Sequence, residues 1–326
     1  MNDRQAQPAR QGNDRHPSFS GVIPPVVTPL TDDGDIDRAS LERLVGHLLG
    51  AGVSGLFTLG SSGETAYLTP DRQDEVVRIV TGTAGGQVPV VVGAIETTTD
   101  RAVERARSVE KLGADAVVAT APYYTRTDAA EIERHFRHVA AAVDLPLLAY
   151  DVPVCVHSKL EPEMLLRLAA DGVLAGVKDS SGDDGSFRRL VLGARELPGF
   201  SALTGHELVV DAVMLGGADG AVPGLGNVDP HGYVRLHEAA VRGDWAAAKA
   251  EQDRLVALFD IVRAARPGTA SASAAGIGAF KTALTLLGVI ATNAVSAPMR
   301  RLDDGEAAVI ADCLERAGLT LALSGS

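Results

Sequence analysis

The feature that most constrains the fold is a repeated alternation of short apolar runs and longer amphipathic runs, which begins at residue 21. The apolar runs are rich in Val, Leu and Ala, as is typical of parallel strands that are buried on both faces. Eight such runs occur, at residues 21–27, 54–59, 88–94, 115–120, 146–151, 173–178, 200–204 and 219–223. Because helical runs separate them, the order predicts an α/β fold, a closed (β/α)8 TIM barrel, and not an open doubly wound sheet.

The pattern divides the chain into three segments. Residues 1–18 are polar and lack the apolar centre of a signal peptide, so we expect a disordered or loosely ordered N-terminal tail and no export. Residues 19–243 carry the barrel pattern. Residues 244–326 show no strand pattern, so we predict a C-terminal helical extension in which residues 263–276 form a loop. Within this extension we expect Lys281 to make surface contacts.

Charge and cysteine content exclude several classes of function. The net charge of −12 argues against nucleic acid or an anionic membrane as a partner. No apolar run reaches about 18 residues, so the sequence predicts no membrane span. Cys155 and Cys313 cannot make a disulfide framework and fit a reducing compartment, so we expect a cytoplasmic protein.

One predicted helical segment carries residues that are spaced like the ligands of a metal site. Glu131, His135 and His138 recur about one helical turn apart, but they fall beside or opposite the apolar stripe of that segment. We therefore expect a solvated helix face there. The sequence predicts neither a metal ion nor another cofactor.

Polar side chains close most of the predicted strands. In a barrel of this kind, the active groups gather where the strands end at their carboxyl side. We therefore expect one lysine, three tyrosines and two adjacent serines on one rim. The residues at these strand ends are Thr28, Ser61, Ser62, Gly63, Glu64, Tyr123, Tyr124, Tyr150, Lys178, Gly205, His206 and Glu207.

The segment GVLAGVKDSSGD, residues 172–183, places Lys178 at the end of an apolar strand. Apolar surroundings remove hydration from an ammonium group and so favour the neutral amine. A neutral amine attacks a ketone to form a Schiff base, which stabilises a carbanion on the adjacent carbon atom. Tyr150 could carry protons to and from the amine and the substrate oxygen. The alternative is that Lys178 only extends towards water or Asp179.

The segment LGSSGETA, residues 59–66, combines glycines, two hydroxyl groups and free backbone N–H groups ahead of a helix. Such a nest suits a carboxylate, because N–H donors and the start of a helix both favour an anion. An ordinary Gly-Ser turn with a capping serine is the alternative for this motif taken alone.

The sequence carries five motifs, GSSGE, APYY, AYDVP, GVKDSSGD and GGADGAV, whose order and spacing resemble the dihydrodipicolinate synthase / N-acetylneuraminate lyase family. The resemblance covers nearly the whole chain, from about Gly21 to the C-terminal helices. It implies a class I, pyruvate-type Schiff-base aldolase on a (β/α)8 barrel. Members of the family are usually homotetramers, arranged as a dimer of dimers.

The resemblance also implies a role for each matching residue. Lys178 would be the Schiff-base lysine and Tyr150 the general acid and base. Ser61 and Ser62 would hold the carboxylate of the 2-oxo acid, with Ser62 also in a proton relay. Tyr124 would complete this relay, in many members from a neighbouring subunit. The other expected substrate contacts are Gly63, Ser180, Gly205, Glu207 and His157, with an exposed loop position as the favoured alternative for His157.

Position 155 departs from the branch that serves lysine biosynthesis. In that branch an arginine two residues after the proline of Tyr-Asn-Val-Pro binds the carboxylate of the aldehyde. Here the segment reads YDVPVC, and Cys155 stands at the position of the arginine. An uncharged thiol cannot replace a bidentate guanidinium group. His157 and Lys159 could supply positive charge, but neither is in register, so 4-hydroxy-tetrahydrodipicolinate synthase is an alternative and not the leading prediction.

The sialic acid branch is matched only in part. N-acetylneuraminate lyases hold sugar hydroxyl groups with an Asp-Glu pair after the seventh strand, whereas here Glu207 is followed by Leu208, and Gly224 replaces a hydroxyl residue. The leading prediction is a Schiff-base lyase acting on pyruvate, or a related 2-oxo acid, and an aldehyde, with a substrate of the 2-keto-3-deoxy sugar acid type. N-acetylneuraminate lyase is a further alternative. A non-catalytic 2-oxo acid binding protein and a metal-dependent aldolase are rivals from other classes.

Overall fold

The computed structural model describes residues 19–322, so the prediction for residues 1–18 lies outside the described residues. Eight parallel strands form one sheet in the order β1-β8-β7-β6-β5-β4-β3-β2. A parallel bridge between Pro25 and Phe57 brings the segment after β1 against β2, so the sheet returns to its first strand. All eight predicted strands are present in shortened form. Their bounds are Gly21–Val22 (β1), Leu56–Thr58 (β2), Val90–Gly93 (β3), Ala116–Thr120 (β4), Leu147–Asp151 (β5), Gly176–Asp179 (β6), Ser201–Thr204 (β7) and Gly220–Ala221 (β8).

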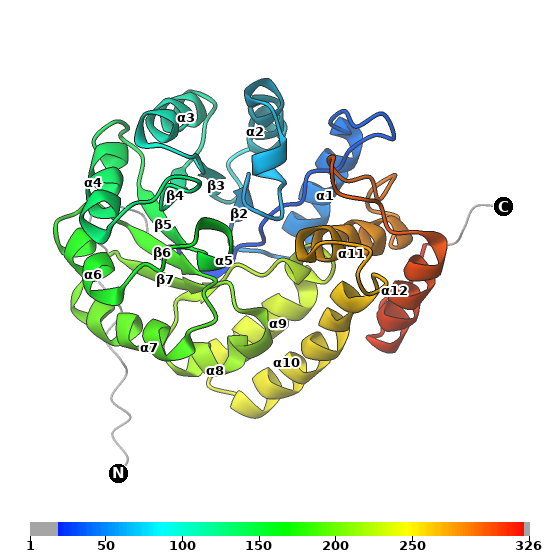
Figure 1. The fold of residues 1–326 in the computed structure, drawn as a ribbon. Coiled ribbons are helices and arrows are strands. Elements are labelled where there is room, and N and C mark those ends of the chain that lie inside the picture. The colour runs from blue at the N-terminus through cyan, green and yellow to red at the C-terminus, as the bar shows by residue number, and fades with distance from the viewer. Residues whose placement is uncertain (1–18, 323–326) are drawn as a thin grey trace, which may run out of the picture.

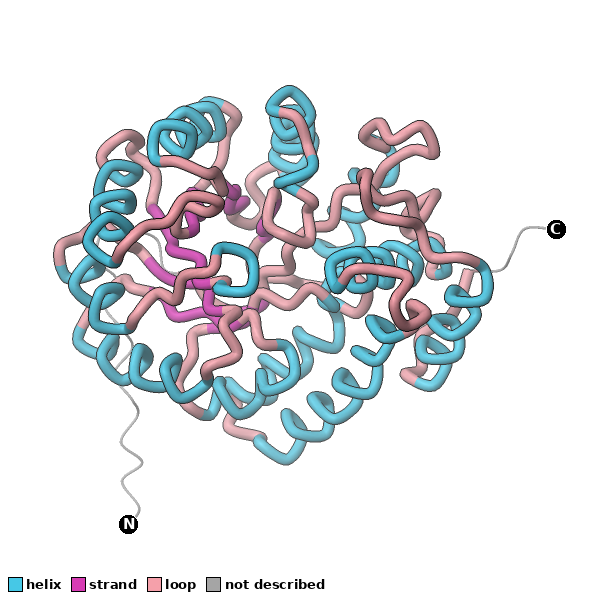
Figure 2. The backbone as a smooth tube through the Cα atoms, viewed as in Figure 1, coloured by secondary structure: helices cyan, strands magenta, loops and turns pink. Residues whose placement is uncertain are grey.

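Helices surround the strands (Figures 1 and 2). Helices α1 to α9 lie between and after the strands, and α10, α11 and α12 follow at the C-terminal end. The bounds of the helices are Arg38–Gly50 (α1), Pro70–Ala84 (α2), Thr99–Lys111 (α3), Ala129–Ala140 (α4), Pro153–Val156 (α5), Pro162–Ala170 (α6), Asp184–Gly193 (α7), Val210–Leu215 (α8), Pro230–Val241 (α9), Trp245–Phe259 (α10), Ala272–Leu286 (α11) and Asp304–Arg316 (α12).

The core lies on both faces of the sheet because the strands are apolar throughout. Val91, Val118 and Leu148 project into the barrel, where they line a small interior cavity. On the outside, helices cover the sheet with their apolar stripes, as α4 does with the buried side chains of Ile132 and Phe136. A sheet covered on both faces leaves the ends of its strands as the place for polar chemistry.

The prediction of a solvated face on α4 is wrong for His135. This side chain is 2% exposed, and its Nδ1 lies 3.1 Å from Thr99 Oγ1. Burial lowers the pKa of His135 to about 4. Glu131 instead serves the start of the helix, where its carboxylate accepts the Asp128 N–H in a capping box.

The C-terminal helices begin earlier than the sequence suggests. Helix α11 starts at Ala272, because the Ser271 hydroxyl accepts the Ala274 N–H at 3.1 Å and caps the helix. The predicted loop over residues 263–276 is therefore wrong at its C-terminal end. No helix within residues 19–322 is long and apolar enough to cross a membrane. The division of the chain at residues 243 and 244 stays a prediction.

Gly220 offers a test of how the barrel closes. A Cβ atom at this position would lie 2.1 Å from the carbonyl oxygen of Gly21, so the pairing of β8 with β1 would have to open. We expect Gly220→Ala to lower the free energy of unfolding by about 2–3 kcal/mol, measured by urea denaturation. Gly46→Ala is the control, since it adds a Cβ with no atom within 4 Å in the exposed part of α1. It should stabilise by roughly 0.5–1 kcal/mol. An unchanged urea midpoint for Gly220→Ala would contradict this picture of closure.

Candidate active site

Three strand ends place Thr120, Tyr150 and Lys178 in one row. Thr120 of β4 lies opposite Tyr150 of β5, and Tyr150 lies opposite Lys178 of β6. Side chains alternate between the two faces of a sheet, so residues in register on neighbouring strands point to the same face. The row runs along the carboxyl end of the sheet, where the sequence predicted the chemistry to lie.

Lys178 lies between two aromatic rings in the barrel interior. Its side chain is 5% exposed, and Nζ lies 4.1 Å from the ring centroid of Tyr150 and 4.8 Å from that of Phe57. Within residues 19–322, Lys178 has no hydrogen bond and no ion pair. The alternative in which it contacts Asp179 is not what the structure shows, because that carboxylate accepts the N–H and O–H of Ser181.

Ser180 and Gly205 lie against the lysine. A Cβ atom at Gly205 would lie 3.2 Å from Lys178 Cε and 2.0 Å from Ser180 Oγ. The Gly205 N–H donates to the carbonyl oxygen of Asp179 at 2.6 Å, which joins the ends of β6 and β7. Glycine is therefore required at position 205, because any larger side chain would displace the lysine or the serine.

Glu207 is a buried carboxylate close to the same lysine. It begins a short 3-10 helix, Glu207–Val209, and its carboxylate accepts the N–H of Leu225 at 2.8 Å and the hydroxyl of Tyr233 at 3.1 Å. Burial raises the pKa of Glu207, while these hydrogen bonds and the charge of Lys178 act in the opposite direction. Glu207 is thus close enough to interact electrostatically with the lysine, but its oxygen atoms are held by its own neighbours.

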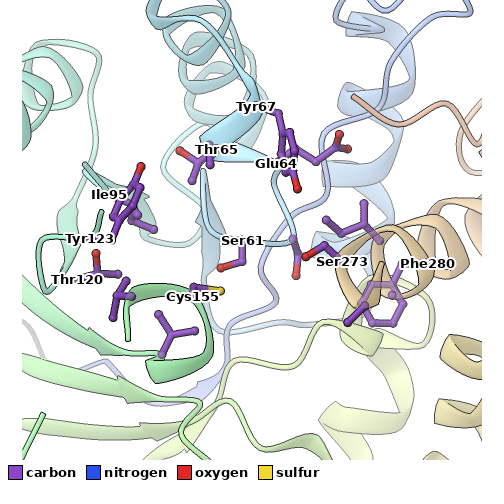
Figure 3. A pocket seen from close by; sticks show the side chains of 17 residues that line it. Ser61, Glu64, Thr65, Tyr67, Ile95, Thr120, Tyr123, Cys155, Ser273 and Phe280 are labelled. Carbon is purple, nitrogen blue, oxygen red and sulfur yellow. The ribbon is translucent and has the colours of Figure 1, made fainter. Parts of the chain in front are cut away.

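A pocket of about 290 Å³ opens at this end of the barrel (Figure 3). The loop after β2 contributes Ser61 and Ser62, and the end of β4 contributes Thr120 and the loop residue Tyr123. Burial raises the pKa of Tyr123. Lys178 lines the interior cavity and not this pocket. Thr120 lines the pocket and also belongs to the row of strand ends, where it lies opposite Tyr150.

Helix α11 forms a wall of the pocket that the sequence did not predict. Ser273, Gly276, Ile277 and Phe280 of this helix line it together with residues of the β2 loop (Figure 3). The prediction had placed the first five residues of this helix, 272–276, in a loop. A capping serine at position 271 was the signal that could have located the start of the helix.

Thr120 was also missed. Its Oγ1 atom is buried and has no hydrogen-bond partner in the described part of the chain. A buried polar group without a partner calls for an explanation, and here the hydroxyl group is available to a bound molecule. A threonine at the last position of a predicted strand was the sequence signal.

The loop of the two serines is fixed from both sides. Thr28 Oγ1 donates to the carbonyl oxygen of Gly63 at 2.7 Å, which holds the loop to the segment after β1. Glu64 adopts a left-handed backbone with φ of 61°, and its carboxylate forms an ion pair with Lys281 of α11. The expectation of surface contacts for Lys281 is wrong, since its side chain has 0% exposure. An isolated lysine within the apolar run GIGAFKTALTLLG was the signal that could have indicated its burial.

Of the predicted site residues, only Ser61 and Ser62 line the pocket, and Lys178, Tyr150, Ser180, Gly205 and Glu207 lie deeper at the strand ends. Two others, Tyr124 and His157, are exposed at the surface. Tyr124 is 95% exposed, and Tyr123 takes the place at the pocket wall. His157 follows the short helix α5 and is exposed to solvent. Cys155 of the same helix does line the pocket, at the position where the related motif has arginine.

Lys159 supplies no charge to the pocket because two carboxylates bind it. Its Nζ forms an ion pair with the buried Asp151 and lies 3.6 Å from Asp179 Oδ2. Burial raises the pKa of Asp151 to about 6, although the hydrogen bond from Lys159 opposes this. The two carboxylates thus lie at the ends of β5 and β6, directly after Tyr150 and Lys178. Lys159 balances their negative charge.

The chain is similar to known proteins over most of its length. The sequence model described as "Dihydrodipicolinate synthetase family" matches residues 18–317. The 4-hydroxy-tetrahydrodipicolinate synthase of Phenylobacterium zucineum (strain HLK1) is 36% identical over 244 residues, which cover 74% of this chain and 81% of that protein. A protein of Halobacterium salinarum named as an uncharacterized DapA-like lyase is 35% identical over 299 residues, 92% of this chain and 94% of that protein.

Solved structures show the same architecture. YagE from E. coli K12, a prophage protein of the dihydrodipicolinic acid synthase family in complex with pyruvate, matches with a TM-score of 0.86 and 29% identity over 93% of this chain and 99% of its own. Dihydrodipicolinate synthase from Bacteroides thetaiotaomicron matches with a TM-score of 0.85 and 32% identity, over 91% of this chain and 98% of its own. The similarity therefore extends across the fold and is not confined to a motif.

The cluster around Lys159 generates a prediction about stability. Lys159→Met would leave Asp151 and Asp179 without their cation, so we expect the free energy of unfolding at pH 8 to fall by about 2–3 kcal/mol. At pH 5 the loss should be smaller, because a buried carboxyl group with a raised pKa takes up a proton and no longer repels its neighbour. Urea denaturation at both pH values measures this difference. Asp151→Asn in the Lys159→Met background should recover most of the loss, and an equal loss at pH 5 and pH 8 would refute the electrostatic explanation.

Proposed function

This chain belongs to the dihydrodipicolinate synthetase family, whose members are lyases of the aldolase type, and we propose that it acts through a Schiff base on Lys178. The reaction makes or cleaves a carbon–carbon bond between pyruvate, or a related 2-oxo acid, and an aldehyde. The observation that carries the proposal is the position of Lys178 over two aromatic rings, without an ion-pair partner in residues 19–322. Its nitrogen is therefore not held by a carboxylate, and a lysine amine that is free of such a partner can attack a ketone.

The chemistry follows from a neutral amine beside a phenol. The amine adds to C2 of the 2-oxo acid, and loss of water gives an iminium ion. Removal of a proton from C3 gives an enamine, which adds to the aldehyde carbon, and water then hydrolyses the new iminium ion to release the product. Tyr150, whose ring centroid lies 4.1 Å from the lysine nitrogen, is the proposed acid and base for these proton transfers.

The carboxylate of the 2-oxo acid is proposed to bind at the loop of Ser61 and Ser62. Both serines line the pocket, and the loop is fixed by the hydrogen bond from Thr28 to Gly63. Hydroxyl groups and backbone N–H groups held in one loop stabilise an anion. Thr120, which lines the same pocket and has an unpartnered hydroxyl, is a further candidate donor.

The pocket suits an aldehyde without a charge. No arginine and no lysine is found among the described residues that line it, whereas Thr65, Tyr67 and Ser273 supply hydroxyl groups and Phe280 supplies apolar surface. Cleavage of a 2-keto-3-deoxy sugar acid releases pyruvate and an uncharged hydroxyaldehyde, so this substrate class fits the lining. Cys155 leaves no guanidinium group for the second carboxylate of aspartate semialdehyde.

Tyr124 supports a proposal about assembly. Its side chain is 95% exposed in the single chain, which is unusual for an aromatic side chain. We propose that it enters the site of a neighbouring copy within a homotetramer and completes the proton relay there with Ser62. A cytoplasmic location likewise stays a prediction from the sequence.

A retro-aldol screen tests the proposed function. We expect release of pyruvate from 2-keto-3-deoxy sugar acids, followed with lactate dehydrogenase, and a loss of all detectable release in Lys178→Ala. Tyr150→Phe should lose at least about a hundredfold in kcat, because a positioned acid or base contributes on that scale. Release that persists in Lys178→Ala would refute the proposal, as would inactivity of the native protein on sugar acids, N-acetylneuraminate, and pyruvate with aspartate semialdehyde.

Cys155→Arg tests the choice of aldehyde. A guanidinium group at this position of the pocket wall would bind a carboxylate in two hydrogen bonds. We expect the ratio of kcat/KM for aspartate semialdehyde to that for the preferred uncharged aldehyde to rise by at least about tenfold. Cys155→Met is the control, since it changes size without adding charge. Efficient use of aspartate semialdehyde by the native protein would overturn the inference from Cys155.

A further inference from the structure

The ion pair between Glu64 and Lys281 joins two walls of the pocket. Glu64 lies two residues after Ser62 in the β2 loop, and Lys281 follows Phe280 in helix α11. Both side chains have 0% exposure. Glu64 Oε2 also accepts the N–H of Ser296 at 2.7 Å. Figure 3 shows Glu64 in the same loop as Ser61, with Phe280 on the helix at the other side of the pocket.

Lys281 is held in place as firmly as its partner. Its Nζ donates to the carbonyl oxygen of Ala294 at 2.8 Å and contacts Glu64 Oε1. Burial lowers the pKa of Lys281, and Glu64 opposes that effect. Arg301, the other cation that acts on Lys281, forms its own ion pair with Asp32. The lysine is therefore the direct counter-charge of Glu64.

Glu64 presents an electrostatic problem for the proposed substrate. It lines the same pocket as Ser61 and Ser62, where the negatively charged carboxylate of a 2-oxo acid is proposed to bind. Two negative charges that share a pocket of low dielectric repel each other. A buried carboxylate next to an anion site is compatible with binding only when a cation cancels its charge.

We propose that Lys281 is a positioning residue for the 2-oxo acid, which acts through Glu64. It cancels the charge of Glu64 next to the loop of Ser61 and Ser62. This inference rests on the proposed function, because it requires that the loop of Ser61 and Ser62 binds a carboxylate. It assigns a role in substrate binding to a helix that follows the eight strands, and to a residue that does not touch the substrate.

Exchange of the methyl hydrogens of pyruvate for deuterium in D2O, followed by NMR, measures the effect without an aldehyde. The iminium ion loses a proton from the methyl carbon, and the enamine takes up a deuteron from solvent, so exchange reports on pyruvate binding and on Lys178 together. In Lys281→Met we expect KM for pyruvate to rise by at least about tenfold, with kcat for exchange within about threefold of the native value. Glu64→Gln in the Lys281→Met background should bring KM back to within about threefold, because it removes the uncompensated charge.

Arg105→Met is the matched control. Arg105 pairs with Asp74 between helices α2 and α3, and neither residue lines the pocket, so KM should stay unchanged. If the native protein shows no exchange, the proposed function fails. If it shows exchange but KM is unchanged in Lys281→Met, or the second substitution does not restore it, only the role of Lys281 fails. If Lys281→Met does not fold, the double variant Glu64→Gln, Lys281→Met provides the test. A KM for pyruvate more than about tenfold above the native value would overturn the inference, and a KM within about threefold of it would support the inference.

Discussion

Removing an ammonium group from water is costly, and this barrel holds three lysine side chains largely or wholly away from solvent. Lys159 and Lys281 are each paired with carboxylates. Lys178 instead lies against the faces of two aromatic rings, and no carboxylate forms an ion pair with it in residues 19–322. The difference separates two lysines that are held by carboxylates from one whose nitrogen has no such partner in residues 19–322.

The two paired lysines make that arrangement possible. Lys159 compensates the carboxylates that directly follow Tyr150 and Lys178 in their strands, so these charges do not draw the ammonium form of Lys178 into an ion pair. Lys281 compensates Glu64 beside the serine loop. Negative charge is thus cancelled at these two places, while the buried carboxylate of Glu207 is held by Leu225 and Tyr233. The pocket itself is left with hydroxyl groups and apolar surface.

The sequence was sufficient for the parts of the site that depend on one strand at a time. Apolar runs located all eight strands, and the rule that chemistry gathers at their carboxyl ends indicated Lys178 and Tyr150 before any contact was known. It was insufficient where a side chain depends on a partner far away in the chain. Lys281 reads as a surface residue because nothing near it in sequence reveals Glu64, and His135 reads as solvated until Thr99 of the neighbouring helix is brought against it. The wall formed by α11 was missed for the same reason, since only the closed barrel brings that helix to the β2 loop.

Reduction with borohydride in the presence of saturating pyruvate tests most directly whether Lys178 forms the Schiff base. Reduction of an iminium ion leaves the pyruvate carbon skeleton attached to the lysine by a stable bond, and peptide mass spectrometry identifies the residue that carries it. We expect the modification on the peptide that contains Lys178 and not on those of Lys159 and Lys281, whose nitrogen atoms are bound to carboxylates. An unmodified Lys178, or equal labelling of the three lysines, would contradict the assignment of Lys178 as the nucleophile.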